Sequence, residues 1–535
     1  MNLSTTDEVP CNGPCRKRFR ALNMDQATAS VLLSSGRTSG LQWLCPACHQ
    51  AQTFNPQYIS AIRYGTDLPP ELWIMIFRYL GKRSLLQVRL TCHRWKEIVV
   101  QNQSLAKKFC VVFDGQCTMD EQFRPENLFP ASRAEFCTTW IISVDGWWPS
   151  FGAGLTELCI SSCRITLPVL LGMLKKTPNL TCLSLGHVES TSAEEINVDF
   201  RLEKLECLSC AMISDVYGNI FTRLRELNLE IELENGEDEK VCRVLQSVQG
   251  TLQQLDCQLT PFMMEQMASM DRLQLKKVAV RQAVGDLVVE LSQIQGSIEH
   301  LVVIATVEDL CKIGRNLTKL KEISSIMVDC GTPSFLAEMR QLKVLDLEGF
   351  EEDRWNFEQF GSATLTSLKL NKFSISGLQR FLTNCPNLQE LQMFECVLDS
   401  WSDVFAARFE SLRRLHLGSS SVLQNVMNVP AKLKCLKKLR ISSCDICAEM
   451  LVELLQQCPR LEKLKLFGMS SIDDKFVGIL GQFPQLRKLQ IFYCAITDKS
   501  LQLIAENYSH LNVDIKSRKI SDAAIKLFRY ATRSV

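Results

Sequence analysis

The chain lacks several features that define common classes of protein. Its net charge is +1 over 535 residues, so no general excess of positive charge points to nucleic acid as its partner. No apolar run is long enough to cross a membrane, and no secretory signal opens the chain. We therefore expect the 24 cysteines to be reduced thiols of a cytoplasmic or nuclear protein, not a disulfide framework.

Motifs of catalysis are equally scarce. The six histidines are scattered, and none forms a metal-binding pair at helical spacing or lies in a recognised nucleophile motif. The segment Gly152-Ala153-Gly154 lacks the third glycine and the preceding strand of a dinucleotide-binding loop, and there is no P-loop. These absences favour a binding protein over an enzyme.

What the chain does contain is a long series of repeats. The template Leu-x2-Leu-x-Leu, with apolar substitutions allowed, recurs in steps of 22 to 28 residues. This period predicts an α/β solenoid of leucine-rich repeats over residues 155–535, with a curved parallel sheet and outer helices. The copies start at Leu155, Leu180, Leu202, Leu224, Leu252, Leu275, Ile298, Leu320, Leu342, Leu365, Leu388, Leu412, Leu436, Leu461 and Leu486, and a degenerate copy starts at Leu511.

A second pattern, at residues 68–98, has apolar residues at helical spacing. Pro70 suits the first turn of a helix, and Gly81 suits its end. Ser84 and Gln87 predict a capping box for a second helix. The run begins with Leu68-Pro69-Pro70-Glu71-Leu72 and ends with Val88, Cys92 and Trp95. It resembles an F-box over about 40 residues, and we assign residues 67–109 to this domain.

The resemblance implies a docking surface for the Skp adaptor of cullin-based ubiquitin ligases. The residues expected on this surface, or supporting it, are Leu68, Pro69, Leu72, Ile76 and Trp95. The alternative is an ordinary helical hairpin whose apolar face packs on the rest of the chain.

Cysteines mark the repeats as well. They follow the template start by eight residues at Cys163, Cys210, Cys396, Cys444 and Cys494. This spacing resembles the cysteine-containing class of leucine-rich repeats that often follows an F-box.

Residues 110–154 have no clear repeat, and we expect a connecting or capping segment there. Degenerate first repeats are an alternative, because 109–113 and 140–144 look like strands.

The first 50 residues predict a zinc module. The pairs Cys11/Cys15 and Cys45/Cys48 bracket 29 residues, which suits one tetrahedral zinc ion held by four thiolates. The second pair looks like a knuckle of a treble-clef or zinc-ribbon module. The alternative is four free cysteines in a flexible tail. Residues 51–66 are polar and read as a linker.

The basic cluster Arg16, Lys17, Arg18 and Arg20 follows the first cysteine pair. It suits a nuclear-import signal or a phosphate-contacting edge, although such clusters are more often solvated surface.

The repeats also predict which side chains face the concave surface. Because side chains alternate along a strand, positions two, four and six after each start should face the concave surface. These positions are acidic or neutral in the early and middle repeats and basic in the late ones. The late residues are Arg414, Lys438, Arg440, Lys463, Lys465 and Lys488, with Phe467 and Phe492 beside them. They suit an acidic or phosphorylated segment of a protein substrate, or are merely solvated lysines.

Together these patterns imply, through the F-box resemblance, a substrate receptor of a Skp–cullin–F-box ubiquitin ligase. Such a subunit contributes proximity and orientation rather than chemistry. One alternative is a nuclear adaptor that reads chromatin or nucleic acid through the zinc module. Another is a solenoid scaffold that never engages a ligase.

Overall fold

The computed structural model describes residues 8–10, 18–20 and 68–533, with short gaps at 107, 116, 126–127, 129–130, 187–197, 231–235, 282–284, 350–353, 408, 430–432 and 509–510. The chain divides into two compact units, Met1–Phe109 with Phe129–Ser132, and Cys110–Leu128 with Arg133–Val535. In the first unit, β1 (Glu8–Pro10) pairs antiparallel with β2 (Arg18–Arg20). The expected zinc ligands Cys11, Cys15, Cys45 and Cys48 and the linker 51–66 lie outside the described residues.

The F-box-like pattern folds into short helices. In the described part of the first unit these are α4 (Pro70–Arg78), α5 (Lys82–Thr91), α6 (His93–Gln101) and α7 (Gln103–Ala106). The predicted capping box at Ser84 is wrong, because α5 already begins at Lys82 with Gly81 as its N-cap. Gly81 has extended backbone, with φ −74° and ψ 168°. Ser84 therefore lies inside the first turn, where its hydroxyl cannot take the N-cap position.

Three aromatic rings form the centre of these helices. The Trp95 ring of α6 lies 4.6 Å from that of Trp73 and 5.5 Å from that of Phe77, between centroids. Trp73 and Phe77, both in α4, stack on each other at 5.4 Å. Leu85 of α5 and Val99 of α6 are fully buried. The three helices thus share one small apolar core.

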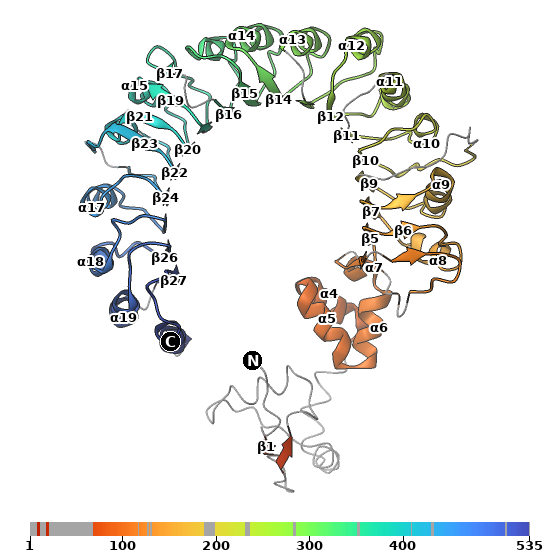
Figure 1. Ribbon diagram of the computed structural model, residues 1–535, viewed down its shortest axis with the longest axis horizontal. Coiled ribbons are helices and arrows are strands. Elements are labelled where there is room, and N and C mark those ends of the chain that lie inside the picture. The colour runs from red at the N-terminus through yellow and green to blue at the C-terminus, as the bar shows by residue number, and fades with distance from the viewer. Residues whose placement is uncertain are drawn as a thin grey trace. The chain divides into compact units, whose positions relative to one another are not determined.

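One parallel sheet of 18 strands runs through the second unit in chain order. Its strands line the inner side of an arc and the helices its outer side (Figure 1). In the described residues no pairing joins the first strand to the last. The strands are β3 (Cys110–Phe113), β5 (Arg133–Cys137), β7 (Glu157–Ser161), β9 (Cys182–Gly186), β10 (Cys207–Cys210), β11 (Glu226–Leu229), β12 (Gln254–Gln258), β13 (Lys277–Arg281), β14 (His300–Ala305), β15 (Glu322–Met327), β16 (Val344–Glu348), β18 (Ser367–Asn371), β20 (Glu390–Phe394), β22 (Arg414–Gly418), β24 (Lys438–Ser442), β25 (Lys463–Phe467), β26 (Lys488–Phe492) and β27 (Asn512–Lys516).

The sheet begins earlier than the boundary expected at Leu155. Strands β3 and β5 pair in parallel with each other, and β5 pairs in the same way with β7. Residues 110–154 therefore contribute degenerate first repeats to the solenoid. The leucine template missed them because Val, Ala and Phe occupy the core-facing positions that leucine fills in later repeats.

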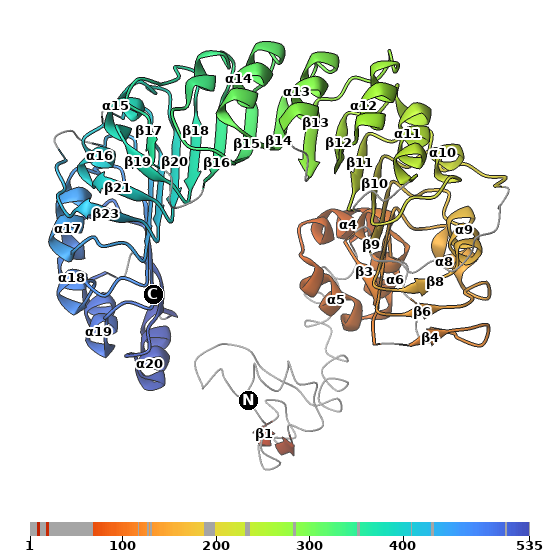
Figure 2. The ribbon, with the colours of Figure 1, turned by 45° about the horizontal axis from the view of Figure 1, so that its top comes forward.

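Helices and two smaller sheets form the outer side of the second unit. The small sheets are β4 (Thr118–Met119), β6 (Trp140–Ile141) and β8 (Arg164–Ile165), and β17 (Arg354–Asn356), β19 (Ser374–Ser376), β21 (Val397–Ser400) and β23 (Ser421–Gln424). Figure 2 shows the second of these outside the main sheet. The helical segments are α8 (Trp148–Gly152), α9 (Leu167–Lys175), α10 (Tyr217–Ile220), α11 (Glu237–Val248), α12 (Pro261–Ala268), α13 (Gly285–Ile294), α14 (Val307–Asn316), η2 (Ser334–Ala337), α15 (Leu378–Thr383), α16 (Ser402–Phe405), α17 (Ala448–Gln456), α18 (Asp474–Ile479), η3 (Leu480–Gln482), α19 (Asp498–Asn507) and α20 (Asp522–Arg533). Within the described residues, no helix combines the length and apolar character needed to span a membrane.

The alternation predicted for the strands is present. In β24, Leu439 and Ile441 are buried, whereas Lys438 and Arg440 are exposed. Buried positions of neighbouring strands stack in register, as Leu439 does on Leu464. A repeat therefore buries its apolar residues only when a neighbour is present.

Four of the five cysteines that lie eight residues after a template start follow a strand, and Cys210 is the last residue of β10. Cys396 is buried, and its thiol donates to the Phe394 carbonyl oxygen at 3.2 Å. Cys444 contacts the Ser442 carbonyl oxygen in the same way at 3.4 Å. Burial raises the pKa of the Cys444 thiol to about 11. These cysteines are protonated small hydrophobic residues and fit the structural role predicted for them.

Candidate functional site

The first candidate surface is the outward face of α4. Leu72 and Ile76 are 42% and 44% exposed and lie one helical turn apart. Pro69 is exposed and Leu68 is half-buried at the start of the helix. The Arg94 guanidinium donates to the Leu68 carbonyl oxygen at 2.9 Å and ties this start to α6. An exposed apolar row on a firmly held helix suits contact with another protein.

Trp95 has a different position from the other expected docking residues. Its ring packs on Trp73 and Phe77 in the core between α4 and α6, and the residue is half-buried. Trp95 therefore packs against the buried face of α4 and is not part of the exposed apolar row formed by Leu72 and Ile76.

Four further apolar residues are exposed in this segment, and sequence reasoning assigned none of them to the docking surface. They are Met75, Tyr79, Leu86 and Leu90. Helical periodicity includes some of them but does not distinguish buried from exposed positions in so small a unit. A domain of this size cannot bury all of its apolar side chains. Their exposure widens the apolar surface around α4 and α5.

The second candidate surface lies on the concave side of the late repeats. Lys438 and Arg440 of β24 lie directly opposite Lys463 and Lys465 of β25, and Lys463 lies opposite Lys488 of β26. We call these five residues the basic strip. They come from three repeats and are adjacent because neighbouring strands are about 4.8 Å apart.

Charge pairing distinguishes the basic strip from the rest of the concave face. Arg281 binds the Asp256 carboxylate at 2.8 Å, and Lys369 binds that of Asp346 at 2.9 Å. Among the described residues, no ion pair includes a member of the basic strip. Within the described residues, the strip is therefore a local excess of positive charge without a paired carboxylate.

Arg414 lies at the edge of this surface but is already neutralised. Its guanidinium is 2.5 Å from the Glu390 carboxylate on the neighbouring strand β20. We expected Arg414 to attract an acidic substrate together with the strip. Because Glu390 neutralises it, Arg414 should attract an acidic substrate less strongly than the unpaired cations do.

Aromatic side chains flank the basic strip. Phe467 is 37% exposed and meets the ring of Tyr493 edge-on at 5.2 Å. The Lys465 ammonium lies 5.3 Å from the centre of the Phe492 ring, a cation–π distance. Sequence reasoning missed Tyr493, because it sits at the turn after β26, with φ 56°, where the strand alternation no longer applies.

His416 lies beside the basic strip, opposite Arg440. Its ring meets Phe394 edge-on at 4.4 Å, and its Nε2 atom has no hydrogen-bond partner. Burial lowers the pKa of His416 to about 4, and Arg440 and Lys465 contribute to the shift. The imidazole is therefore neutral at pH 7 and leaves the charge of the strip unchanged.

A third surface, in the middle repeats, is apolar. Val302 of β14 and Ile326 of β15 are exposed on the concave side, and Val328 is exposed just beyond β15. Ile304 lies opposite Ile326 in the register. These apolar residues occupy positions that are polar in most other repeats, which is the signal that sequence reasoning overlooked. The patch could contact an apolar side chain of a bound protein.

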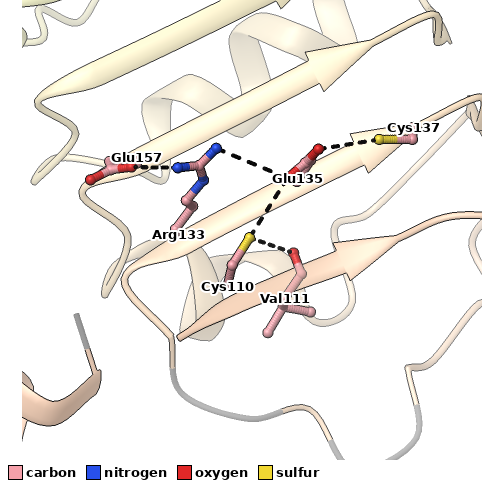
Figure 3. Close-up of polar contacts among 6 residues, drawn as sticks. All are labelled: Cys110, Val111, Arg133, Glu135, Cys137 and Glu157. Carbon is pink, nitrogen blue, oxygen red and sulfur yellow. Dashed lines mark hydrogen bonds and ion pairs between the residues drawn. The ribbon is translucent and has the colours of Figure 1, made fainter. Parts of the chain in front are cut away.

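In the early repeats the concave face carries paired charges and cysteine thiols, as Figure 3 shows. Arg133 lies between two carboxylates, 3.4 Å from Glu157 and 4.0 Å from Glu135. The thiols of Cys110 and Cys137 lie 3.9 Å and 3.6 Å from Glu135. Burial and Glu135 raise the pKa of Cys137, so its thiol is not activated as a nucleophile.

Comparisons with known families agree with this architecture. A model of F-box-like domains matches residues 66–112. A second model, the LRR repeats of the FBD-associated F-box protein At5g56370, matches residues 400–474. These matches support an F-box and leucine-rich-repeat protein. The fold is an α/β leucine-rich-repeat solenoid that follows the F-box-like domain.

Two further comparisons concern whole proteins. The chain is similar to TLR13 in a crystal structure with ssRNA13, at 16% identity and a TM-score of 0.44. The match covers 73% of this chain and 54% of TLR13, so the chain spans about half the length of that protein. No curated protein matches the chain significantly.

Among the described residues, no cluster of three or more His, Cys, Asp or Glu side chains could hold a metal ion. The predicted zinc ligands are not among those residues, and their coordination stays a prediction. The cysteines that are described are free thiols.

Proposed function

We propose that this protein is the substrate-recognition subunit of a Skp–cullin–F-box ubiquitin ligase. The observation that carries the proposal is the exposed apolar row on α4, within a segment that matches F-box-like domains. Such domains generally bind the Skp adaptor, which links them to a cullin. The protein itself would perform no chemistry and would hold its target near a ubiquitin-loaded enzyme.

The substrate would bind the concave face of the solenoid. The basic strip supplies attraction for an acidic or phosphorylated segment, and Phe467 and Phe492 supply apolar contact. The predicted residues at this site remain Arg414, Lys438, Arg440, Lys463, Lys465, Phe467, Lys488 and Phe492. Free thiols throughout the described residues support a reducing location, in the cytoplasm, the nucleus or both.

Capture of a purified Skp adaptor by the full-length chain tests the proposed role. Replacing Leu72 and Ile76 together by Ala should weaken capture at least tenfold, because burying each apolar side chain is worth roughly 1.5–3 kcal/mol. Lys96→Ala, at an exposed position of α6, is the matched control and should leave capture unchanged. Unaltered capture by the double variant would reject α4 as the adaptor surface and, with it, the proposed function.

A further inference from the structure

The backbone positions of four cations of the basic strip form a rectangle on two strands. Lys438 and Arg440 form one side, and their opposite residues Lys463 and Lys465 form the other. The strands are about 4.8 Å apart, and alternate residues along a strand are about 6.6 Å apart. Cationic side chains carried by positions so close to one another repel each other unless an anion lies between them. The rectangle is therefore suited to a compact anion of high charge.

The rectangle has clear limits along the sheet. On the side of β22, Arg414 is paired with Glu390, so the free charge stops there. On the other side, Lys488 is the last cation on β26, where Gln490 donates to the Asp514 carboxylate at 3.3 Å. The five cations of the basic strip thus span three strands, or about 10 Å, and the exposed Lys516 of β27 lies beyond them, opposite Phe492. The footprint of the strip itself accommodates one or two phosphate groups.

We propose that the rectangle binds the phosphate of a phosphorylated serine or threonine in an extended segment of the substrate protein. This inference rests on the proposed function and specifies its substrate class. A phosphate carries a charge of about −1.5 to −2 and three acceptor oxygens. It can therefore engage several of the four cations at once, and the Arg440 guanidinium can bind it with two parallel hydrogen bonds. A single carboxylate would leave at least three cations without a counter-charge.

The aromatic residues beside the rectangle define what flanks the phosphate. Phe467 and Phe492 lie opposite each other in the register, on the same side of Lys465. Tyr493 adds a third ring, 5.2 Å from Phe467. Exposed rings at the edge of a charged site favour an apolar side chain next to the phosphorylated residue.

His416 offers a reporter of binding that does not depend on ligase activity. The charged groups that face it are Arg414 on its own strand, Glu390 on β20, Lys438 and Arg440 on β24 and Lys465 on β25. A phosphate held by Arg440 and Lys465 would offset their positive field. The pKa of His416 should therefore rise from about 4 when the site is filled.

The test uses the full-length chain and synthetic peptide libraries. One library has a fixed central phosphoserine and randomised neighbours, and two matched libraries carry serine or glutamate instead. At physiological ionic strength we expect at least tenfold tighter binding of the phosphoserine library, with apolar residues enriched beside the phosphoserine. Binding should weaken as the pH falls from about 7.5 to about 5.5, because the phosphate takes up a second proton near pH 6. Glutamate peptides should not show this loss.

Variants locate the site. Arg440→Glu and Lys463→Glu should each abolish preferential binding of phosphoserine peptides. Lys277→Glu is the matched control, because Lys277 is exposed at the same strand position in an earlier repeat. His416 should shift its titration, followed by NMR, only when the phosphopeptide is present. Binding without that shift would place the peptide elsewhere and overturn the proposal.

Two other outcomes would also overturn it. Equal binding of the serine and phosphoserine libraries would show that the strip does not read phosphate. Tighter binding of single-stranded RNA than of any phosphopeptide would assign the strip to nucleic acid. Capture of the Skp adaptor by the same preparations tests the proposed function separately from the phosphate site. If capture is retained while phosphopeptides fail to bind, only the phosphate site is rejected.

Discussion

At the scale of single residues, His416 shows how the fold controls a titrating group. Its ring is partly buried against Phe394 and faces Arg440 and Lys465. Each of these contacts disfavours the charged imidazolium, so the pKa falls from 6.5 to about 4. In the unfolded chain the same imidazole takes up a proton near pH 6.5.

This difference predicts a pH dependence of stability. Between about pH 6.5 and pH 4 the unfolded state binds a proton that the folded state does not, so stability falls as the pH is lowered. His416→Gln removes that proton and should reduce the acid destabilisation by on the order of 2 kcal/mol. Thermal midpoints at several pH values would measure it.

The matched control for His416 is His93→Gln, in the first unit. It should leave the pH dependence of the second unit as it is in the wild type. Parallel pH curves for the wild type and His416→Gln would contradict the depressed pKa.

At the scale of elements, each late repeat turns at the seventh position after its template start. Glu395, Ser419, Ser443 and Tyr493 all have positive φ there, between 48° and 56°. Gly468 occupies the same position, with φ 62°. A left-handed backbone is unfavourable for residues with a Cβ atom, so each non-glycine turn carries strain that stacking of the repeats must offset.

Gly468 and Gly478 should therefore respond oppositely to alanine. At Gly468 a Cβ would lie 2.8 Å from the Ser443 Oγ atom and the φ is positive, so Gly468→Ala should destabilise by about 1–2 kcal/mol. At Gly478, in α18, a Cβ would meet nothing within 4 Å, and Gly478→Ala should stabilise by about 0.5–1 kcal/mol. Denaturant unfolding of both variants would test this, and a shift of the same sign for both would refute it.

At the scale of the whole molecule, the chain separates two tasks. The apolar row on α4 belongs to one compact unit and the concave surfaces belong to the other. A solenoid is stabilised by contacts between neighbouring repeats, so a change in one repeat has mainly local effects. Variants of the basic strip should accordingly retain the adaptor surface.

The zinc module predicted for residues 1–50 gives a further test at this scale. Purified protein should contain one zinc ion per chain, bound by Cys11, Cys15, Cys45 and Cys48. Cys45→Ser should lose the metal and unfold only the N-terminal module, because metal binding and folding are coupled in so short a segment. Elemental analysis measures the zinc, and melting of the solenoid should not change. Metal-free protein prepared without chelator would count against the module.

Much of the architecture could be predicted because it depends on local periodicity. The spacing of Leu439 and Ile441, repeated in each strand, requires alternate burial and so defines both faces of the sheet. The helix at Pro70 follows in the same way from its apolar spacing. The start of the sheet at Cys110 was predicted only as an alternative to a connecting segment, because strands without leucine carry a weaker signal in the sequence.

The sequence alone determined which residues face the concave surface, because side-chain alternation is a property of a strand by itself. Only the tertiary structure decided which of those charges are free. Arg414 and Lys438 occupy equivalent positions in their repeats. Arg414 pairs with Glu390 on the preceding strand, whereas Lys438 lies between two cations, Arg414 on one neighbouring strand and Lys463 on the other. Trp95 likewise matches the F-box pattern, but its packing on Trp73 assigns it to the core. Pairing and burial depend on neighbours distant in sequence, and these become adjacent only when the repeats stack and the helices pack.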